Sequence, residues 1–250
     1  MQGVSPLLEA KDLHIRFGGV VAAAGIHLQV YPGELLAIIG PNGAGKTTFL
    51  NLCTGYLKPE RGKVLLEGKE ITGLPPRTIA RMGVARAFQI PQLFTDHTVE
   101  ENLLLALAAR EGFWGWNPLR DSVRRREAWD LLTLVGLDGV AATPVSEAPE
   151  GVRKLLDVAM ALALKPRLLL LDEPTSGVSS EEKFRVMDTL VQALRSRGVS
   201  AVFVEHDMEV VRRYADRVAV WAEGRILGEG RPAEVLSDPQ VLASVVGVEE

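Results

Sequence analysis

Cysteine is almost absent from this chain, because Cys53 is the only one in 250 residues. A lone cysteine excludes a disulfide within the chain and is compatible with a reducing compartment. We expect Cys53 to be a small buried hydrophobic residue. Stability must then come from packing, and a hydrophobic content of 47% is enough to bury a sizeable core.

Long uncharged apolar runs are absent too. A helix that spans a bilayer needs about 18 or more such residues, and the richest run, 155–171, is interrupted by Asp157 and Lys165. The N-terminal residues also lack the basic segment followed by an apolar segment that marks a signal peptide. We therefore expect any membrane role to depend on a partner protein.

An excess of positive charge is also missing. The formal net charge is −4, which disfavours a protein whose main partner is nucleic acid, because such proteins usually present a basic face. No N-K-x-D run occurs, so a guanine-specific enzyme is disfavoured as well. The chain has no internal repeat, and its length suits one α/β domain with or without an inserted subdomain.

The first third of the chain has the pattern of strands and turns. A short continuous apolar run at 35–40 follows the turn sequence VYPGE and leads into a glycine-rich loop. The pattern then predicts a hairpin at 56–68, a short helix at 74–83 and a strand at 84–89.

From about residue 90 to residue 164 the pattern changes to helix. Thr98 stands three residues before Glu101, a capping-box spacing that predicts a helix start. Beyond residue 164, strands and helices alternate, which predicts a largely parallel sheet with crossover helices. The chain is therefore expected to be an α/β protein with a helical subdomain inserted into its core.

The run GPNGAGKT, 40–47, matches the phosphate-binding pattern G-x-x-x-x-G-K-[ST] at every position. Its glycines let backbone N–H groups turn inward around phosphates, and the following helix directs its positive end at the anion. Lys46 would supply a cation to the β and γ oxygens, and Thr47 a hydroxyl to Mg²⁺. The residues predicted to bind nucleotide here are Gly40, Pro41, Asn42, Gly43, Ala44, Gly45, Lys46, Thr47 and Thr48.

The run LLLLDE, 168–173, ends an apolar strand in two carboxylates. Alone, such a pair is more often a solvated strand end, but its place far beyond a phosphate loop favours a nucleotide-hydrolysing site. We predict that Asp172 lies in the Mg²⁺ shell and that Glu173 orients and polarises the attacking water. Adjacent strand residues point to opposite faces, so the two carboxylates are expected to have different tasks.

With these motifs the chain resembles the nucleotide-binding subunits of ABC transporters over nearly its whole length. Three further residues match that family. Phe17 matches the aromatic that stacks on adenine, and His206 matches the switch histidine near the γ-phosphate. Gln89 matches the glutamine that links the nucleotide site, including its metal, to the helical subdomain. Without the resemblance, Phe17 and His206 would be interpreted as ordinary core or surface residues.

The segments 71–94 and 204–211 resemble, more narrowly, the ATPase subunits of branched-chain amino-acid importers. The resemblance implies a P-loop NTPase core with a mainly parallel sheet, an N-terminal antiparallel β subdomain and an inserted helical subdomain. It implies ATP and Mg²⁺ as ligands, and two permease subunits and an extracytoplasmic substrate-binding protein as partners. It places the chain in the cytoplasm, on the inner face of the membrane. The expected organisation is one domain over 1–250, with a β and RecA-like core at 7–89 and 165–230, a helical subdomain at 90–164 and C-terminal helices at 231–250.

One motif departs from the family. There, two subunits pack head to tail, and each ATP lies between one phosphate loop and the other subunit's L-S-G-G-Q-like signature. The corresponding run here is Ala148–Val152. Pro149 lacks a hydroxyl and a backbone donor, Val152 lacks a side-chain amide, and Glu150 adds a carboxylate. Gly151 remains, and a helix expected from Val152 would still direct its positive end at the partner's ATP. Each lost charge-assisted hydrogen bond costs about 1.5–3 kcal/mol.

The chain thus keeps what would serve its own ATP and has lost part of what it would lend to a partner. This favours a heterodimer with a second ATP-binding subunit that has an intact signature, and a homodimer stays open. Ser179 stands where many relatives carry an acidic residue that reaches across the dimer. With Glu182 it also fits a helix capping box, so its role is open.

Two other functions remain as alternatives: a nucleotide-binding regulator with little hydrolysis, and an ABC ATPase outside transport. One segment has no assigned role. Phe113, Trp114 and Trp116 lie in the turn-rich run 112–118, which is either a docking surface for a membrane subunit or local loop packing. The basic run Arg124–Glu127 is interpreted as a solvated helix face.

Overall fold

The computed structural model describes residues 4–111, 122–239 and 241. Within them a six-stranded sheet has the order β10-β9-β3-β8-β7-β6. Its neighbouring strands run parallel except for the β9–β10 hairpin. The strands of this larger sheet are β3 (Leu35–Ile39), β6 (Val84–Ala87), β7 (Leu168–Asp172), β8 (Ser200–Val204), β9 (Arg217–Ala222) and β10 (Arg225–Gly230).

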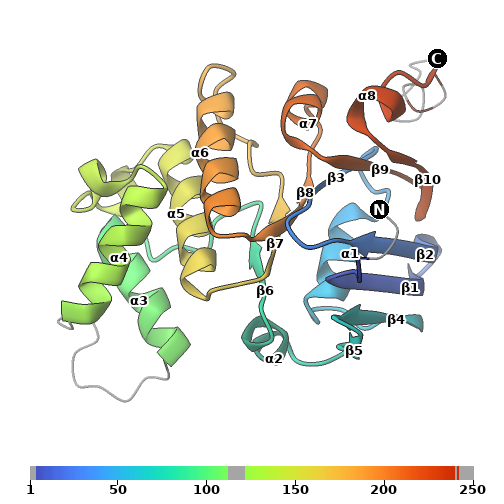
Figure 1. The fold of residues 1–250 in the computed structure, drawn as a ribbon, viewed down its shortest axis with the longest axis horizontal. Coiled ribbons are helices and arrows are strands. Elements are labelled where there is room, and N and C mark those ends of the chain that lie inside the picture. Colours follow the sequence, from blue (N-terminus) through green and yellow to red (C-terminus); the bar gives the residue numbers. More distant parts are fainter. Residues whose placement is uncertain (1–3, 112–121, 240, 242–250) are drawn as a thin grey trace.

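A smaller antiparallel sheet is built from the N-terminal part of the chain, with the order β2-β1-β4-β5. Its strands are β1 (Leu8–Phe17), β2 (Val20–Val30), β4 (Arg61–Leu66) and β5 (Lys69–Glu70). Helix α1 (Lys46–Cys53) lies beside this sheet in Figure 1. Phe49 and Leu50 of α1 join one buried cluster with residues of both sheets. Cys53 is fully buried in that cluster, as expected for a small hydrophobic residue.

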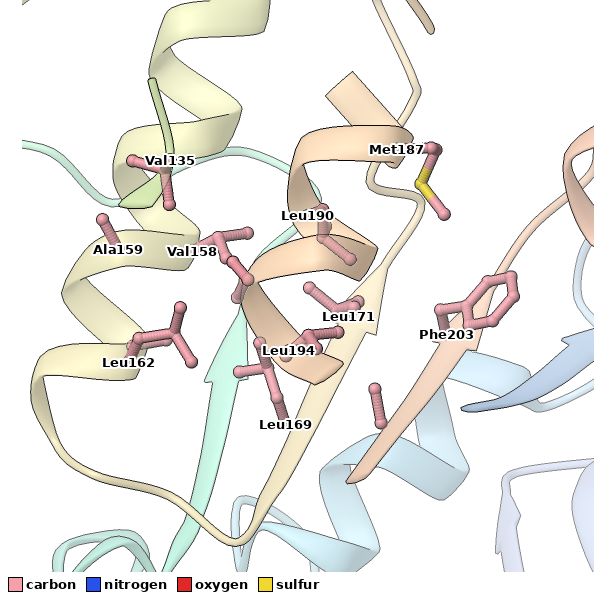
Figure 2. Close-up of a cluster of buried hydrophobic side chains, with 14 of the residues drawn as sticks. Val135, Val158, Ala159, Leu162, Leu169, Leu171, Met187, Leu190, Leu194 and Phe203 are labelled. Atoms are coloured by element: carbon pink, nitrogen blue, oxygen red, sulfur yellow. The ribbon is translucent and has the colours of Figure 1, made fainter. Parts of the chain in front are cut away.

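The central strands are apolar on both faces, because both faces of the sheet are covered. In β3, Leu36 and Ile38 belong to the cluster around α1, whereas Leu35, Ala37 and Ile39 belong to the cluster on the other face. Helices α5 (Glu150–Ala163) and α6 (Glu182–Ser196) cover that other face. Figure 2 shows side chains from α5 and α6 gathered over β7 and β8. Helix α5 is thereby packed onto the sheet whose strand ends carry the polar motifs.

The inserted helical part packs α3 (Val99–Glu111), α4 (Ser122–Leu134) and α5 against one another, on the left in Figure 1. The predicted capping box is present at the start of α3. Thr98 Oγ1 accepts a hydrogen bond from Glu101 N at 3.2 Å, and Glu101 Oε2 accepts one from Thr98 N at 2.9 Å. The remaining elements are the helices α2 (Pro76–Arg81), α7 (Met208–Tyr214) and α8 (Pro232–Val235), and the 3₁₀ turns Asp138–Val140 and Val145–Glu147.

Helix α5 differs from its sequence interpretation. The helix was expected from Val152, but it begins at Glu150, with Pro149 as the residue before it. Proline fits this place because its fixed φ is −59° here and the first helical positions need no intrahelical N–H donor. Gly151 therefore lies inside the first turn. The prediction for Phe113, Trp114 and Trp116 lies outside the described residues, as does most of the chain beyond α8.

Candidate functional site

The loop between β3 and α1 has the conformation that its glycines allow. Gly40 and Gly45 have φ values of 149° and 104°. A Cβ atom at Gly40 would lie 1.9 Å from the Trp221 carbonyl oxygen, and one at Gly45 would lie 2.0 Å from the Ala22 carbonyl oxygen. Only glycine permits this close approach of the loop to the backbone beneath it. Gly43, at the exposed tip, has no atom near its Cβ position, so the outer side of the loop is open for a ligand.

Lys46, the first residue of α1, folds back into this loop. Its Nζ donates hydrogen bonds to the carbonyl oxygens of Gly40 at 2.6 Å and of Pro41 at 2.8 Å. Burial lowers the pKa of Lys46, and the negative charges of Glu173 and Asp172 oppose that shift. The ammonium group is therefore held beneath the loop that the sequence assigns to phosphates.

Thr47 and Asp172 bring a hydroxyl and a carboxylate together. Thr47 Oγ1 donates to Asp172 Oδ1 at 3.3 Å. The other carboxylate oxygen, Asp172 Oδ2, accepts from Arg86 at 2.8 Å in a buried ion pair. Arg86 reaches this position from β6 and also donates to Asn51 Oδ1. A hydroxyl and a carboxylate are oxygen ligands that suit Mg²⁺, which is usually held by few protein groups together with substrate phosphates.

Glu173 is the point where three strand ends meet. Its Oε1 lies 2.8 Å from Nε2 of His206, which follows β8. Its Oε2 accepts a hydrogen bond of 2.6 Å from Nε2 of Gln89, which follows β6. The Glu173 backbone has φ 50°, a strained conformation for a residue with a side chain, and its N–H donates to the Val204 carbonyl oxygen at 3.0 Å. The structure thus brings Gln89 and His206, which the sequence also predicted as site residues, into direct contact with Glu173.

The buried residue Glu205 holds together the two segments that carry Glu173 and His206. It is 3% exposed and accepts hydrogen bonds from Thr175 Oγ1 at 2.7 Å and from the backbone N–H groups of Thr175 and His206 at 3.1 Å each. Burial raises the pKa of Glu205, and these hydrogen bonds oppose the shift. The carboxylate fixes the segment after Glu173 to the segment that carries His206.

Phe17 lies at the end of the β1–β2 hairpin. It is 48% exposed, and Val20 and Val21 beside it are exposed as well. Strand β2 also provides Ala22, against which the phosphate loop packs at Gly45. An exposed aromatic ring on the hairpin whose second strand contacts the loop is compatible with stacking on a base.

The signature-like segment is separate from these contacts. In the described part of the chain, no hydrogen bond connects residues 149–152 with residues 40–48. Pro149 is exposed at the start of α5, and Glu150 lies within 3.4 Å of the Cβ position at Gly177. Ser179 Oγ accepts from Glu182 N at 3.3 Å, as the capping-box interpretation predicted, although α6 begins only at Glu182.

Four contributors to the site were missed at the sequence level: Arg86, Glu205, Lys154 and Asp157. Each is a charged residue inside or directly after an apolar element, and that mismatch is the signal that was available. Asp157 and Phe88 illustrate it. Asp157 Oδ2 accepts the Phe88 N–H at 2.9 Å, and burial raises the pKa of Asp157 to about 7.

No described helix is long and apolar enough for a membrane crossing. Within 4–111, 122–239 and 241, no cluster of three or more His, Cys, Asp or Glu side chains forms a metal site.

Comparison with known proteins shows which chains this one is similar to. A family model described as ABC transporter matches residues 23–176. LivG of Escherichia coli strain K12, named a high-affinity branched-chain amino acid transport ATP-binding protein, is 37% identical over 251 aligned positions, which cover 97% of this chain and 98% of that protein. BraF of Pseudomonas aeruginosa, which has the same description, is 34% identical over 252 positions, with 97% and 98% coverage.

Two solved structures have the same fold along nearly the whole chain. The ADP conformation of an ATP-binding cassette of an ABC transporter gives a TM-score of 0.88 at 30% identity, covering 97% of this chain and 99% of that one. A nucleotide-free ATP-binding cassette gives 0.86 at 30% identity, with 97% and 100% coverage. The predicted fold class is confirmed by these matches.

Proposed function

The chain belongs to the ABC transporter family as an ATP-binding subunit, and from this premise we propose that it hydrolyses Mg·ATP to power the import of branched-chain or other hydrophobic amino acids. The observation that carries the hydrolytic part is the contact of Gln89 and His206 with Glu173, beside the Thr47–Asp172 pair. The substrate class is supported by LivG and BraF, which are named for branched-chain amino acid transport.

Each residue has a distinct part in the proposed reaction. The phosphate loop and Lys46 bind the β and γ phosphates, and Phe17 stacks on adenine. The Glu173 carboxylate orients and polarises the attacking water, while Gln89 and His206 hold the two carboxylate oxygens in place. Mg²⁺, held by the Thr47 hydroxyl and the Asp172 carboxylate with Gln89 nearby, would supply positive charge to the phosphate oxygens.

We further propose that the working unit is a heterodimer with a second ATP-binding subunit, docked on two permease subunits at the inner face of the membrane and supplied by an extracytoplasmic binding protein. The support is the uneven set of motifs. The residues for this chain's own ATP are all present, whereas Pro149 and Val152 remove donors that a partner's ATP would need.

The substitution Glu173→Gln tests this function. It keeps the size of the side chain but removes the charge that polarises water. ATP binding should persist, turnover should fall by at least about a hundredfold, and an ATP-bound complex with the partner should accumulate. Steady-state ATPase and gel filtration of the transporter with Mg·ATP give both readouts. Unchanged turnover would remove Glu173 from this role, and a wild-type complex without turnover would favour the regulatory alternative.

A further inference from the structure

Helix α5 carries two buried ionisable side chains that the proposed reaction does not use. Lys154 and Asp157 are three residues apart, so they lie on the same face of the helix. Their exposed fractions are only 5% and 8%. Burial lowers the pKa of Lys154, while the negative charges of Glu150, Asp157, Glu173 and Glu205 oppose the shift. Both groups have therefore lost most of their hydration.

These two side chains hold the backbone that leads into Gln89. Asp157 Oδ2 accepts the Phe88 N–H at 2.9 Å. Lys154 Nζ donates to the Gln89 carbonyl oxygen and, at 3.4 Å, to the Glu173 carbonyl oxygen. One helix face thus fixes the Phe88–Gln89 segment at both ends and reaches the backbone of Glu173.

A purely structural role explains these contacts incompletely. Strand β6 is an edge strand, so its last backbone groups need partners from outside the sheet. A neutral donor would satisfy a carbonyl oxygen at a lower desolvation cost than the buried ammonium of Lys154. No ion pair joins Lys154 and Asp157 directly among the described residues, so the Lys154 ammonium has no direct contact with that carboxyl group. Both side chains hold the Phe88–Gln89 backbone. The Gln89 side chain in turn donates to Glu173 at 2.6 Å.

We propose that Lys154 and Asp157 are positioning residues of the hydrolytic site: they hold Phe88 and Gln89 so that the Gln89 amide stays on Glu173. The same helix starts at Glu150 and carries Gly151 in its first turn. We call the contacts of Lys154 and Asp157 with Phe88 and Gln89 the clamp. A displacement of the start of α5, where a partner's nucleotide would bind, therefore moves the clamp. In this way the clamp links the partner's nucleotide site, which α5 covers, to this chain's own nucleotide site. This inference rests on the proposed function.

The test uses paired substitutions in the full transporter. Lys154→Met keeps the aliphatic stem and removes the ammonium, and Asp157→Leu removes the acceptor of the Phe88 N–H. Each should lower kcat for Mg·ATP at least tenfold and change KM less than threefold, because the phosphate loop is untouched. The conservative variants Lys154→Arg and Asp157→Asn keep a donor and an acceptor, and should retain kcat within threefold of wild type.

Arg110→Met is the matched control. Like Lys154, Arg110 is a cation of the helical part that donates to a main-chain carbonyl oxygen. It donates to the Ala163 carbonyl oxygen of α5 at 2.9 Å and forms an ion pair with Glu127 at 2.7 Å. It contacts neither Phe88 nor Gln89. Its loss should loosen the packing of α3, α4 and α5 without lowering kcat more than threefold.

A second readout needs no turnover. Hydrogen exchange of the isolated full chain reports the Phe88 amide, which should exchange at least tenfold faster in Asp157→Leu than in wild type or Asp157→Asn. Mg·ATPγS should change exchange at both 88–89 and 150–154 in wild type, and at 88–89 alone in Lys154→Met. This result stands even if the assembled wild-type complex fails to hydrolyse ATP, which would defeat only the proposed function.

Three results would overturn the clamp. The first is wild-type kcat in both Lys154→Met and Asp157→Leu, together with unchanged exchange at Phe88. The second is an equal loss of kcat in Arg110→Met, because the loss would then reflect a loosened helical part. The third is an equal loss in Asp157→Leu and Asp157→Asn, because the hydrogen-bond acceptor would then be irrelevant.

Discussion

His206 Nε2 lies 2.8 Å from Glu173 Oε1, and the two residues follow neighbouring parallel strands. The register of those strands explains the contact. Asp172 of β7 pairs with Val204 of β8, so Glu173 and the residues just after Val204 emerge at the same edge of the sheet. Gln89 emerges there too, because β6 lies parallel to β7 on its other side. Carboxyl ends of parallel strands meet at one edge, where ligands of such sheets usually bind.

The first prediction concerns nucleotide binding by the phosphate loop. Lys46→Ala removes the ammonium that now donates to Gly40 and Pro41. The affinity of the isolated chain for Mg·ATP should fall at least about tenfold, since one charge-assisted contact contributes about 1.5–3 kcal/mol. Isothermal titration calorimetry measures this, with Lys63→Ala as the control because Lys63 pairs with Glu70 on the exposed surface of β4. Equal affinity of Lys46→Ala and wild type would contradict the assignment of the loop.

The second prediction concerns the buried ion pair of Arg86 and Asp172, whose side chains are 7% and 2% exposed. Arg86→Met would leave the Asp172 carboxylate buried without its cation. The free energy of unfolding should fall by about 3–5 kcal/mol, as is usual when one partner of a buried pair is removed. Urea denaturation measures the change. Arg213→Met is the control, because its pair with Asp188 is half exposed and should contribute at most about 1 kcal/mol.

The third prediction concerns pH and Asp157. Burial raises the pKa of Asp157 to about 7 from an ordinary value of 3.8, and the hydrogen bond from the Phe88 N–H and the nearby cation Lys154 oppose the shift. Between these values the folded chain keeps a proton that the unfolded chain releases, so protonation favours folding. The stabilisation from this proton is therefore full below pH 3.8 and is lost as the pH rises to about 7.

Asp157→Asn lacks this titration and isolates it. The free energy of unfolding of wild type, relative to Asp157→Asn, should decrease between pH 4 and pH 8 by up to about 4 kcal/mol, at about 1.4 kcal/mol for each pH unit. Denaturation at several pH values gives the difference. A constant difference for Asp157→Asn would mean that Asp157 is ionised throughout this pH range.

Much of the fold follows from local sequence patterns, and the exceptions have physical reasons. Features that depend only on neighbouring residues can be predicted from the sequence. They include the apolar runs of β3 and β7, the phosphate loop and the Thr98–Glu101 capping box. The β9–β10 hairpin was not predicted, because β10 reads RILGEG, with two glycines and two charges, and lies at a sheet edge where propensity is weak. The start of α5 was placed two residues late, at Val152, although a proline directly before the first helical residue is compatible with a helix start.

The site was predictable where a motif carries its own chemistry. Residues 40–48 and the Asp172–Glu173 pair belong to that class, whereas Gln89 and His206 were found only through the family resemblance. Arg86 has no motif at all. Its role depends on β6 lying beside β7, a pairing between distant segments that no local pattern encodes.

The last prediction concerns the altered signature and unequal sites in the assembled transporter. Gly151→Asp in this chain should lower ATPase activity much less than the equivalent change in the partner's intact signature. The partner's nucleotide, which α5 would cover, already has fewer hydrogen-bond donors on this side. Pro149 supplies neither a hydroxyl nor a backbone N–H, and Val152 supplies no side-chain amide. The change is also compatible with the local structure, because a Cβ atom at Gly151 would meet only Val186, at 3.4 Å, and an acid suits the first turn of a helix.

The measurement is ATPase of the purified complex, with the same substitution made in each subunit separately and Glu173→Gln as the reference for a blocked site. We expect activity close to wild type for Gly151→Asp here and at least a tenfold loss for the change in the partner. The double substitution Pro149→Ser with Val152→Gln should raise turnover when the partner's own carboxylate pair is intact, because it restores a hydroxyl, a backbone N–H and a side-chain amide at the start of α5. Equal losses from the two subunits would mean that the two sites are equivalent. The heterodimer with one impaired site would then be wrong, while ATP hydrolysis by this chain would be unaffected.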